Sequence, residues 1–208
     1  MIPLGDRRLY LCTPARDDLT EFLEACISGG VDIVQLRDKH LDARALIRAA
    51  AVSREICHRY GVPFIMNDRP DLALEVGADG VHVGQDDAPV HLCRRILGDD
   101  AIIGLSTHAP SELADALGHD ASYISAGPVV ATPTKPGRPG TGLGYATLAI
   151  DAAEIPVFIT GGVTPENVGD LAEAGVRRFV VVRALTEAVD PHAAAVALRT
   201  AIETALST

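Results

Sequence analysis

The sequence is poor in the residues that several classes of protein require. It has no tryptophan, and aromatic residues make up only 4% of the chain, so the stacking platforms that bind single-stranded nucleic acid are not expected. Its 18 lysines and arginines are outnumbered by 28 aspartates and glutamates, for a formal net charge of -10. Because a general nucleic-acid surface needs a basic face, we expect no nucleic-acid partner. An anionic ligand must instead meet local cations.

Cysteine and long apolar runs are also scarce. The four cysteines, Cys12, Cys26, Cys57 and Cys93, include no CxxC pair, which argues against a zinc site or a disulfide framework and favours buried thiols. No apolar run approaches the roughly 20 residues that span a bilayer, and the N-terminal residues lack the long apolar segment of a secretory signal. The sequence therefore predicts a soluble, cytoplasmic protein with no membrane partner.

What the sequence does contain is a regular alternation of short apolar runs and longer amphipathic ones. With 208 residues and 48% hydrophobic content, it can bury a sizeable core as one domain over residues 1–208. The expected strands are 9–13, 33–36, 63–67, 80–83, 101–105, 123–126, 157–160 and 179–182. The expected helices are 19–28, 42–59, 70–75, 89–97, 111–117, 145–152, 165–174 and 191–205.

This alternation predicts an α/β protein with a parallel sheet, because strands that are apolar on both faces are typical of sheets covered by helices. Several helices have proline near the start, as at Thr164-Pro165 and Asp190-Pro191. Strand-helix units repeated along one domain predict a (β/α)8 TIM barrel. An open doubly wound sheet is the alternative, although no GxGxxG follows the first strand. In a barrel, functional residues lie where strands end and loops begin.

The loop over residues 125–140 has the composition of a phosphate lid. Thr132, Thr134 and Lys135 place two hydroxyls and an ammonium within four residues, a combination that suits phosphate oxygens. Four prolines and three glycines supply stiff segments joined by hinges. The alternative is a solvated, proline-rich connection.

A second group of cations follows the second strand. Gln35, Arg37 and Lys39 alternate along an extended segment, so their side chains emerge on one face and can converge on an anion. With Lys135 they would supply three positive charges. A solvated strand end with an Arg37-Asp38 pair is the alternative, but the position at the barrel mouth favours the anion site.

Two aspartates follow adjacent strands and suggest a metal site. Asp68 and Asp87 could share a hard cation, and Mg2+ commonly takes one or two carboxylates together with substrate phosphates. We therefore expect Mg2+ as the cofactor. Asp68 could alternatively cap the helix that follows it, and Asp86 could replace Asp87 as the ligand, although alternation points Asp86 the other way.

The last two strand ends suggest a second phosphate site. Gly161-Gly162 is expected to open a helix with Thr164-Pro165, where backbone amides at the helix N-terminus would hold a phosphate between loops seven and eight. Val182-Arg183 ends the neighbouring strand. A plain turn would use the same glycines, but it need not coincide with that strand end.

Two histidines lie near these segments. His82, between two valines within an expected strand, is interpreted as a hydrogen-bonded core residue. His108, soon after Ser106, is better placed as a general base, or as a simple hydrogen-bond donor at the rim.

Taken together, these segments resemble the thiamine-phosphate synthase family. The matching motifs are QLRDK at 35–39, Asn67-Asp68, GADGVHVGQDD at 77–87, GLSTH at 104–108, GPVVATPTK at 127–135 and Gly161-Gly162. They span nearly the whole chain in the right order. The resemblance implies a transferase of thiamine biosynthesis, which joins 4-amino-2-methyl-5-hydroxymethylpyrimidine diphosphate to hydroxyethylthiazole phosphate with Mg2+, giving thiamine phosphate and pyrophosphate.

The resemblance also implies a role for each matching residue. The pyrimidine diphosphate would be held by Gln35, Arg37, Lys39, Asn67, Ser106 and Lys135, of which Lys135, Ser106 and Arg37 are the candidate catalytic residues. Mg2+ would be held by Asp68 and Asp87. The thiazole phosphate would be held by Thr132, Thr134, Gly161, Gly162, Val182 and Arg183. The family commonly has serine where this chain has Arg183, so the second phosphate site departs from the family pattern.

Two other functions fit parts of the pattern. A thiazole tautomerase of the same fold needs a base, for which His108 would serve, but leaves Lys39, Asp68, Asp87 and Lys135 without a purpose. A non-catalytic barrel that senses a phosphorylated metabolite would use the same anion sites without turnover. The sequence leaves formation of a homo-oligomer open.

Overall fold

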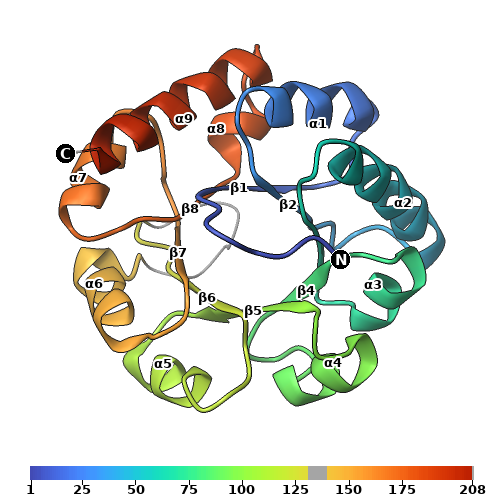
Figure 1. Cartoon of the computed structure of the whole chain (residues 1–208), viewed down its shortest axis with the longest axis horizontal. Helices are drawn as coiled ribbons and strands as arrows, with labels where there is room; N and C mark the ends of the chain where they lie inside the picture. Colours follow the sequence, from blue (N-terminus) through green and yellow to red (C-terminus); the bar gives the residue numbers. More distant parts are fainter. Residues whose placement is uncertain (131–139, 208) are drawn as a thin grey trace.

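The computed structural model describes residues 1–130 and 140–207. In it, parallel strands β1 to β8 form a closed barrel in chain order, and helices surround the barrel (Figure 1). The strands are β1 Leu9–Thr13, β2 Ile33–Leu36, β3 Phe64–Asn67, β4 Gly80–Val83, β5 Ile102–Thr107, β6 Tyr123–Ala126, β7 Val157–Thr160 and β8 Phe179–Val181. The predicted TIM barrel is confirmed, and the alternative of an open sheet is wrong because β1 pairs with β8.

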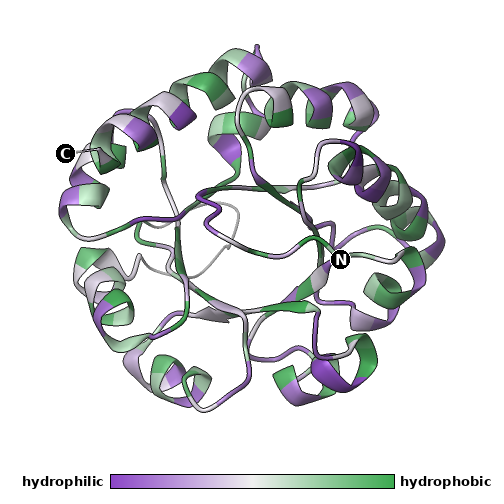
Figure 2. Ribbon diagram, viewed as in Figure 1, coloured by the Kyte–Doolittle hydropathy of each residue, from purple (hydrophilic) through white to green (hydrophobic). Residues whose placement is uncertain are grey.

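The helices cover the outside of the barrel. They are α1 Leu19–Ser28, α2 Ala43–Arg59, α3 Pro70–Val76, α4 Val90–Leu97, α5 Pro110–Ala116, α6 Gly142–Ala152, α7 Val168–Glu173, α8 Arg183–Thr186 and α9 Pro191–Leu206. Each carries both hydrophobic and hydrophilic residues (Figure 2), as expected of helices with one face on a sheet. Within the described part of the chain, none has the length and apolarity needed to cross a membrane.

Two boundaries near the expected second phosphate site differ from the prediction. Helix α7 begins at Val168 rather than at Pro165, because the side chain of Asn167 accepts a hydrogen bond from the Thr164 N–H at 3.0 Å and holds the intervening residues in a turn. The short helix α8 was not expected. By contrast, the predicted start of α9 is confirmed: the Asp190 side chain accepts from the Ala193 N–H at 3.0 Å.

The core has two layers, because successive side chains of a strand point to opposite faces. The larger layer lies between strands and helices. The smaller layer fills the barrel and consists of Tyr10, Cys12, Ile33, Ile65, Ile102, Tyr123, Phe158 and Val180. The three aromatic rings of this inner layer meet edge to face. They form a packed floor beneath the carboxyl ends of the strands.

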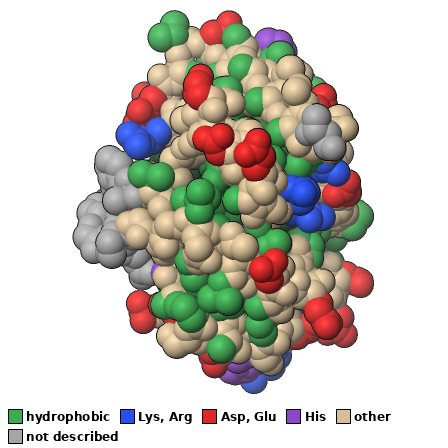
Figure 3. All heavy atoms as spheres, turned by 90° about the vertical axis from the view of Figure 1, so that its left-hand side faces the viewer, with side chains coloured by type: hydrophobic (Ala, Val, Ile, Leu, Met, Phe, Trp, Pro, Cys, Tyr) green, Lys and Arg blue, Asp and Glu red, His purple; other side chains and the backbone are tan. Residues whose placement is uncertain are grey.

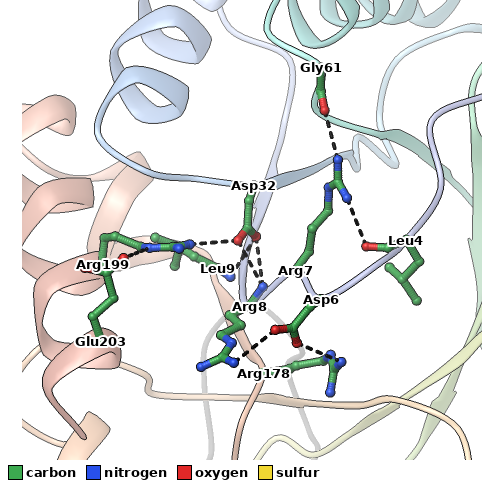
Figure 4. A network of polar contacts seen from close by, with 10 residues as sticks. All are labelled: Leu4, Asp6, Arg7, Arg8, Leu9, Asp32, Gly61, Arg178, Arg199 and Glu203. Carbon is green, nitrogen blue, oxygen red and sulfur yellow. Dashed lines mark hydrogen bonds and ion pairs between the residues drawn. The ribbon is translucent and has the colours of Figure 1, made fainter. Parts of the chain in front are cut away.

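A polar network joins the opposite end of the barrel, where the strands begin (Figure 4). Asp32, before β2, accepts from the backbone N–H of Arg8 at 3.0 Å and from Arg199 of α9 at 2.9 Å. Asp6 pairs with Arg8 at 3.0 Å and with Arg178, before β8, at 3.3 Å. These contacts tie the starts of β1, β2 and β8 to the last helix, so this end is structural.

One face of the outer surface shows how the acidic side chains are distributed. On the side formed around α6 and α7, the Asp and Glu side chains are dispersed among polar and hydrophobic atoms (Figure 3).

Candidate active site

A cavity of about 590 Å³ opens at the carboxyl ends of the strands. It is lined by every candidate substrate or metal residue that the structure describes: Gln35, Arg37, Lys39, Asn67, Asp68, Asp87, Ser106, Gly161, Gly162, Val182 and Arg183. Thr132, Thr134 and Lys135 lie outside the described residues. The closed barrel therefore brings residues from widely separated parts of the chain to one cavity, as strand-end positions predict.

The side of the cavity that carries Arg37 and Lys39 contains an ion pair that the sequence did not predict. Lys39 Nζ lies 2.9 Å from a carboxylate oxygen of Asp68. Asp68 has a backbone φ of 60°, in the left-handed region that non-glycine residues rarely adopt, and its N–H donates to the carbonyl of His82 at 2.8 Å. The alternative that Asp68 caps α3 is wrong, because the N-cap position is occupied by Arg69, whose side chain makes no capping hydrogen bond.

Asp68 and Asp87 are neighbours, as the metal prediction requires. Asp87 accepts from the Gly84 N–H at 2.8 Å. Burial raises the pKa of Asp87, and so do the hydrogen bond with Asp68 and the negative charge of Asp68. Burial also opposes ionisation of Asp68, but the hydrogen bonds with Lys39 and Asp87 and the charges of Lys39 and Arg37 lower the pKa of Asp68. Ionisation of Asp68 therefore disfavours ionisation of Asp87.

Asp86 and His108 also line the cavity. Asp86 is exposed, and the contacts of Asp87 with Asp68 favour Asp87 as the partner carboxylate. His108 is held at the rim by Glu112 of α5, whose carboxylate accepts from the His108 N–H at 2.7 Å and lies 2.9 Å from its Nδ1. The side chain of Gln85 donates to the Ser106 carbonyl at 2.7 Å, which ties the loop after β4 to β5.

Buried polar side chains cross the cavity floor in a connected chain. Gln35 Nε2 donates to Tyr10 Oη at 2.7 Å, and Tyr10 Oη lies 2.8 Å from Tyr123 Oη. Tyr123 Oη lies 2.9 Å from His82 Nδ1, and His82 Nε2 lies 2.8 Å from Ser106 Oγ. The interpretation of His82 as a hydrogen-bonded core residue is confirmed. Sequence reasoning missed both tyrosines, although a tyrosine within a buried strand needs a partner for its hydroxyl.

The opposite side of the cavity is a glycine loop. Gly161 and Gly162 have φ values of 99° and 76°, a conformation that favours glycine, and a side chain at Gly161 would collide with Pro128. Asn167 holds the loop by donating to the Gly162 carbonyl at 2.7 Å as well as accepting from the Thr164 N–H. The predicted helix N-terminus at this point is wrong: a braced loop, rather than the first turn of α7, lines the cavity.

Arg183 and Val182 complete this side. Val182 precedes α8, and Arg183 is the first residue of that helix, exposed and in the cavity wall. Glu187, one turn later, lines the same wall. This side of the cavity therefore combines backbone at the glycine loop with a guanidinium and a carboxylate at its edge.

A closed eight-stranded parallel barrel with a cavity at the carboxyl ends of its strands defines the TIM-barrel class, whose enzymes have their active sites at this end. Comparison with known proteins narrows this class. The chain belongs to the thiamine monophosphate synthase family, whose sequence model matches residues 9–185.

Named relatives are similar over nearly their full lengths. The thiamine-phosphate synthase of Thermobifida fusca is 52% identical over 202 residues, covering 94% of this chain and 92% of the relative. That of Mycobacterium tuberculosis (strain CDC 1551 / Oshkosh) is 46% identical over 216 residues, covering 97% of each. Among solved structures, thiamine phosphate pyrophosphorylase from Pyrococcus furiosus superposes with a TM-score of 0.87 at 29% identity, covering 97% of this chain and 98% of the other.

Proposed function

We propose that this chain, a thiamine-phosphate synthase by its family and relatives, holds its two substrates on opposite sides of the barrel mouth. The pyrimidine diphosphate lies on the side of Arg37, Lys39 and the two aspartates, and the thiazole phosphate lies at the glycine loop. The observation that carries the proposal is that one cavity contains both a cation and carboxylate cluster and a braced glycine loop. Two anionic substrates that must react with each other need this arrangement.

The diphosphate side also suits Mg2+. Asp68 and Asp87 supply neighbouring hard oxygen ligands, and they repel each other when both are ionised. The described residues contain no cluster of three or more His, Cys, Asp or Glu side chains that could hold a metal alone, so Mg2+ here would need its remaining ligands from substrate phosphates and water. When bound there, Mg2+ would neutralise charge on the departing pyrophosphate.

The residues of this chain assist the departure of pyrophosphate by electrostatic stabilisation. Arg37 and the Ser106 hydroxyl donate to the oxygens on which negative charge grows, and Lys39 adds a further positive charge. Lys135 stays a prediction for the same role, as Thr132 and Thr134 do for the thiazole phosphate. Gln35 and Asn67 hold the substrate from the ends of β2 and β3, where both side chains are buried.

Bond formation follows from positioning. The aminopyrimidine stabilises a benzylic-type cation at its methylene carbon once pyrophosphate leaves, and the thiazole nitrogen attacks that carbon. The glycine loop, Val182 and Arg183 hold the thiazole phosphate so that the nitrogen faces the carbon. The buried floor keeps water from the cation. No covalent enzyme nucleophile is needed, and the group transferred from pyrophosphate to the thiazole nitrogen is the pyrimidinylmethyl group.

The test is direct. The purified protein, incubated with both substrates and Mg2+, should form thiamine phosphate and pyrophosphate in equal amounts, and neither should form when one substrate is omitted. Binding without product would identify a sensor. Conversion of a thiazole isomer without use of the pyrimidine diphosphate would identify the tautomerase, which the names of the relatives do not favour. We expect the activity in the cytoplasm, with only small-molecule partners.

A further inference from the structure

In the hydrogen-bonded chain across the cavity floor, the donor and the acceptor of each bond follow from the bonds that Gln35 makes at one end. Gln35 is the starting point: the Cys12 thiol donates to Gln35 Oε1 at 3.5 Å, and Gln35 Nε2 donates to Tyr10 Oη at 2.7 Å. An amide nitrogen has no acceptor lone pair. Tyr10 therefore accepts from Gln35 and cannot donate to it.

The direction passes from Tyr10 to Ser106 one proton at a time. Because a buried hydroxyl proton without an acceptor is costly, the Tyr10 proton goes to Tyr123 Oη, 2.8 Å away. Tyr123 then donates its own proton to His82 Nδ1 at 2.9 Å. With Nδ1 as acceptor, His82 carries its proton on Nε2 and donates it to Ser106 Oγ at 2.8 Å. Ser106 is left with its hydroxyl proton for an acceptor in the cavity.

We propose that Tyr123 is a positioning residue of the synthase, which acts through His82 to orient the Ser106 hydroxyl as a hydrogen-bond donor to the departing pyrophosphate. The inference rests on the proposed function for the identity of that acceptor. The direction of the chain does not depend on the proposed function, because it follows from the Gln35 amide nitrogen as the donor to Tyr10. Tyr123 is fully buried and does not line the cavity, so it acts on the substrate only through its neighbours.

Two features of the structure are built around this contact. Gly104, on β5, lies where any side chain would overlap the Tyr123 ring and hydroxyl and the His82 ring, so glycine makes room for the pair. The rings of His82 and Tyr123 are stacked with centroids 5.6 Å apart, and Tyr10 and Phe158 meet Tyr123 edge to face. Packing on both sides thus fixes the Tyr123 ring.

The hydroxyls remain protonated at neutral pH, as the chain requires. Burial raises the pKa of Tyr10 and of Tyr123 well above the ordinary tyrosine value. Both groups therefore act as neutral donors and acceptors in the folded protein.

The first test is spectroscopic and needs no substrate. In the protein labelled with 15N-histidine, the signals of His82 are identified by their loss in a His82→Asn variant. We expect the neutral tautomer with its proton on Nε2 in the unmodified protein, and a change at Nδ1 in Tyr123→Phe. A proton on Nδ1, or on both nitrogens, would overturn the direction of the chain whatever the enzyme catalyses.

The second test asks whether Tyr123 acts through Ser106. Tyr123→Phe should lower kcat by about 10-fold to 100-fold with little change in the KM for the thiazole phosphate. In the Ser106→Ala background the same substitution should change kcat by less than about 2-fold, because the hydroxyl that it orients is gone. If the kcat losses of Tyr123→Phe and Ser106→Ala instead multiplied in the double variant, Tyr123 would have a general structural role and the proposal would be overturned.

A matched control removes a hydroxyl elsewhere. Tyr60→Phe alters an exposed tyrosine at the end of α2 and should leave both kinetic constants unchanged. Failure of the unmodified protein to form thiamine phosphate would refute the proposed function, whereas the His82 tautomer would still be measured. The two proposals can therefore fail separately.

Discussion

The ammonium of Lys39 lies 2.9 Å from a carboxylate oxygen of Asp68, across the loops that follow β2 and β3. The sequence predicts that both residues contact the pyrimidine diphosphate or its metal, and in the structure their opposite charges pair with each other. Lys39 is half exposed, whereas Asp68 is largely buried. We infer that binding of Mg2+ and diphosphate replaces this pair with contacts from each residue to the ligand.

The Mg2+ requirement of the reaction should change when either Asp68 or Asp87 is replaced. Asp87→Asn and Asp68→Asn should each raise the Mg2+ concentration that gives half-maximal rate, because a neutral amide replaces a charged oxygen ligand. Titrating Mg2+ at saturating substrates measures the effect. Asp86→Asn is the matched control, since Asp86 lines the same cavity but is exposed, and a smaller shift is expected. An unchanged Mg2+ requirement in both Asp68→Asn and Asp87→Asn would refute the assignment of these residues as metal ligands.

Arg183 and Glu187 should have opposite effects on the thiazole phosphate. Both lie on the same wall of the cavity, so Arg183→Ser should raise the KM for that substrate and Glu187→Gln should lower it. For Arg183 the rise should correspond to roughly 1.5–3 kcal/mol if the guanidinium contacts the phosphate, and to less where solvent screens it. The KM for the pyrimidine diphosphate is the internal control. An unchanged thiazole phosphate KM in Arg183→Ser would refute the contact.

The brace at Asn167 should matter for the same substrate. Asn167→Ala removes the hydrogen bonds to Gly162 and Thr164, each worth about 1 kcal/mol, and frees the glycine loop. The KM for the thiazole phosphate should rise, with little change for the pyrimidine diphosphate. Asn167→Asp keeps the acceptor for Thr164 and loses the donor to Gly162, so it should be intermediate. Equal effects on both substrates would indicate general loss of structure.

Alkaline pH should destabilise the barrel through its buried tyrosines. Burial raises the pKa of Tyr10 and Tyr123 above the value of 10.0 for an accessible tyrosine. Stabilisation from these protons is therefore complete below about pH 10 and is lost as the pH rises further, because the unfolded chain releases them first. In a titration followed by tyrosinate absorbance and circular dichroism, these two should ionise only as the fold is lost. Complete ionisation with unchanged circular dichroism would contradict this.

The order of the elements and most candidate site residues could be predicted from the sequence. Alternating apolar runs identify strands locally, since burial on both faces leaves a continuous apolar pattern, as in Ile33–Leu36 of β2. Repetition of strand and helix then restricts the topology to few choices. Because parallel strands end at one edge, the sequence predicts that polar residues such as Arg37 and Asp87 share one mouth, and both line the cavity.

The start of α7 shows the limit of local signals. Thr164-Pro165 is a typical helix start, yet the side chain of Asn167 bonds backward to the loop and delays the helix to Val168. A side chain that bonds to nearby backbone competes with the helix for the same groups. The residues at 164–165 alone therefore do not show where the helix begins.

The sequence by itself determined the barrel, its strand ends and the chemical types available at its mouth, because these follow from patterns within a few residues of each position. Only the tertiary structure decided the pairing of Lys39 with Asp68 and the contact between Tyr10 and Tyr123. The two tyrosines are 113 positions apart in the chain, and their hydroxyls meet only because closure of the barrel and the strand register aim both side chains at its axis. Such contacts depend on the whole closed sheet, so no local pattern contains them.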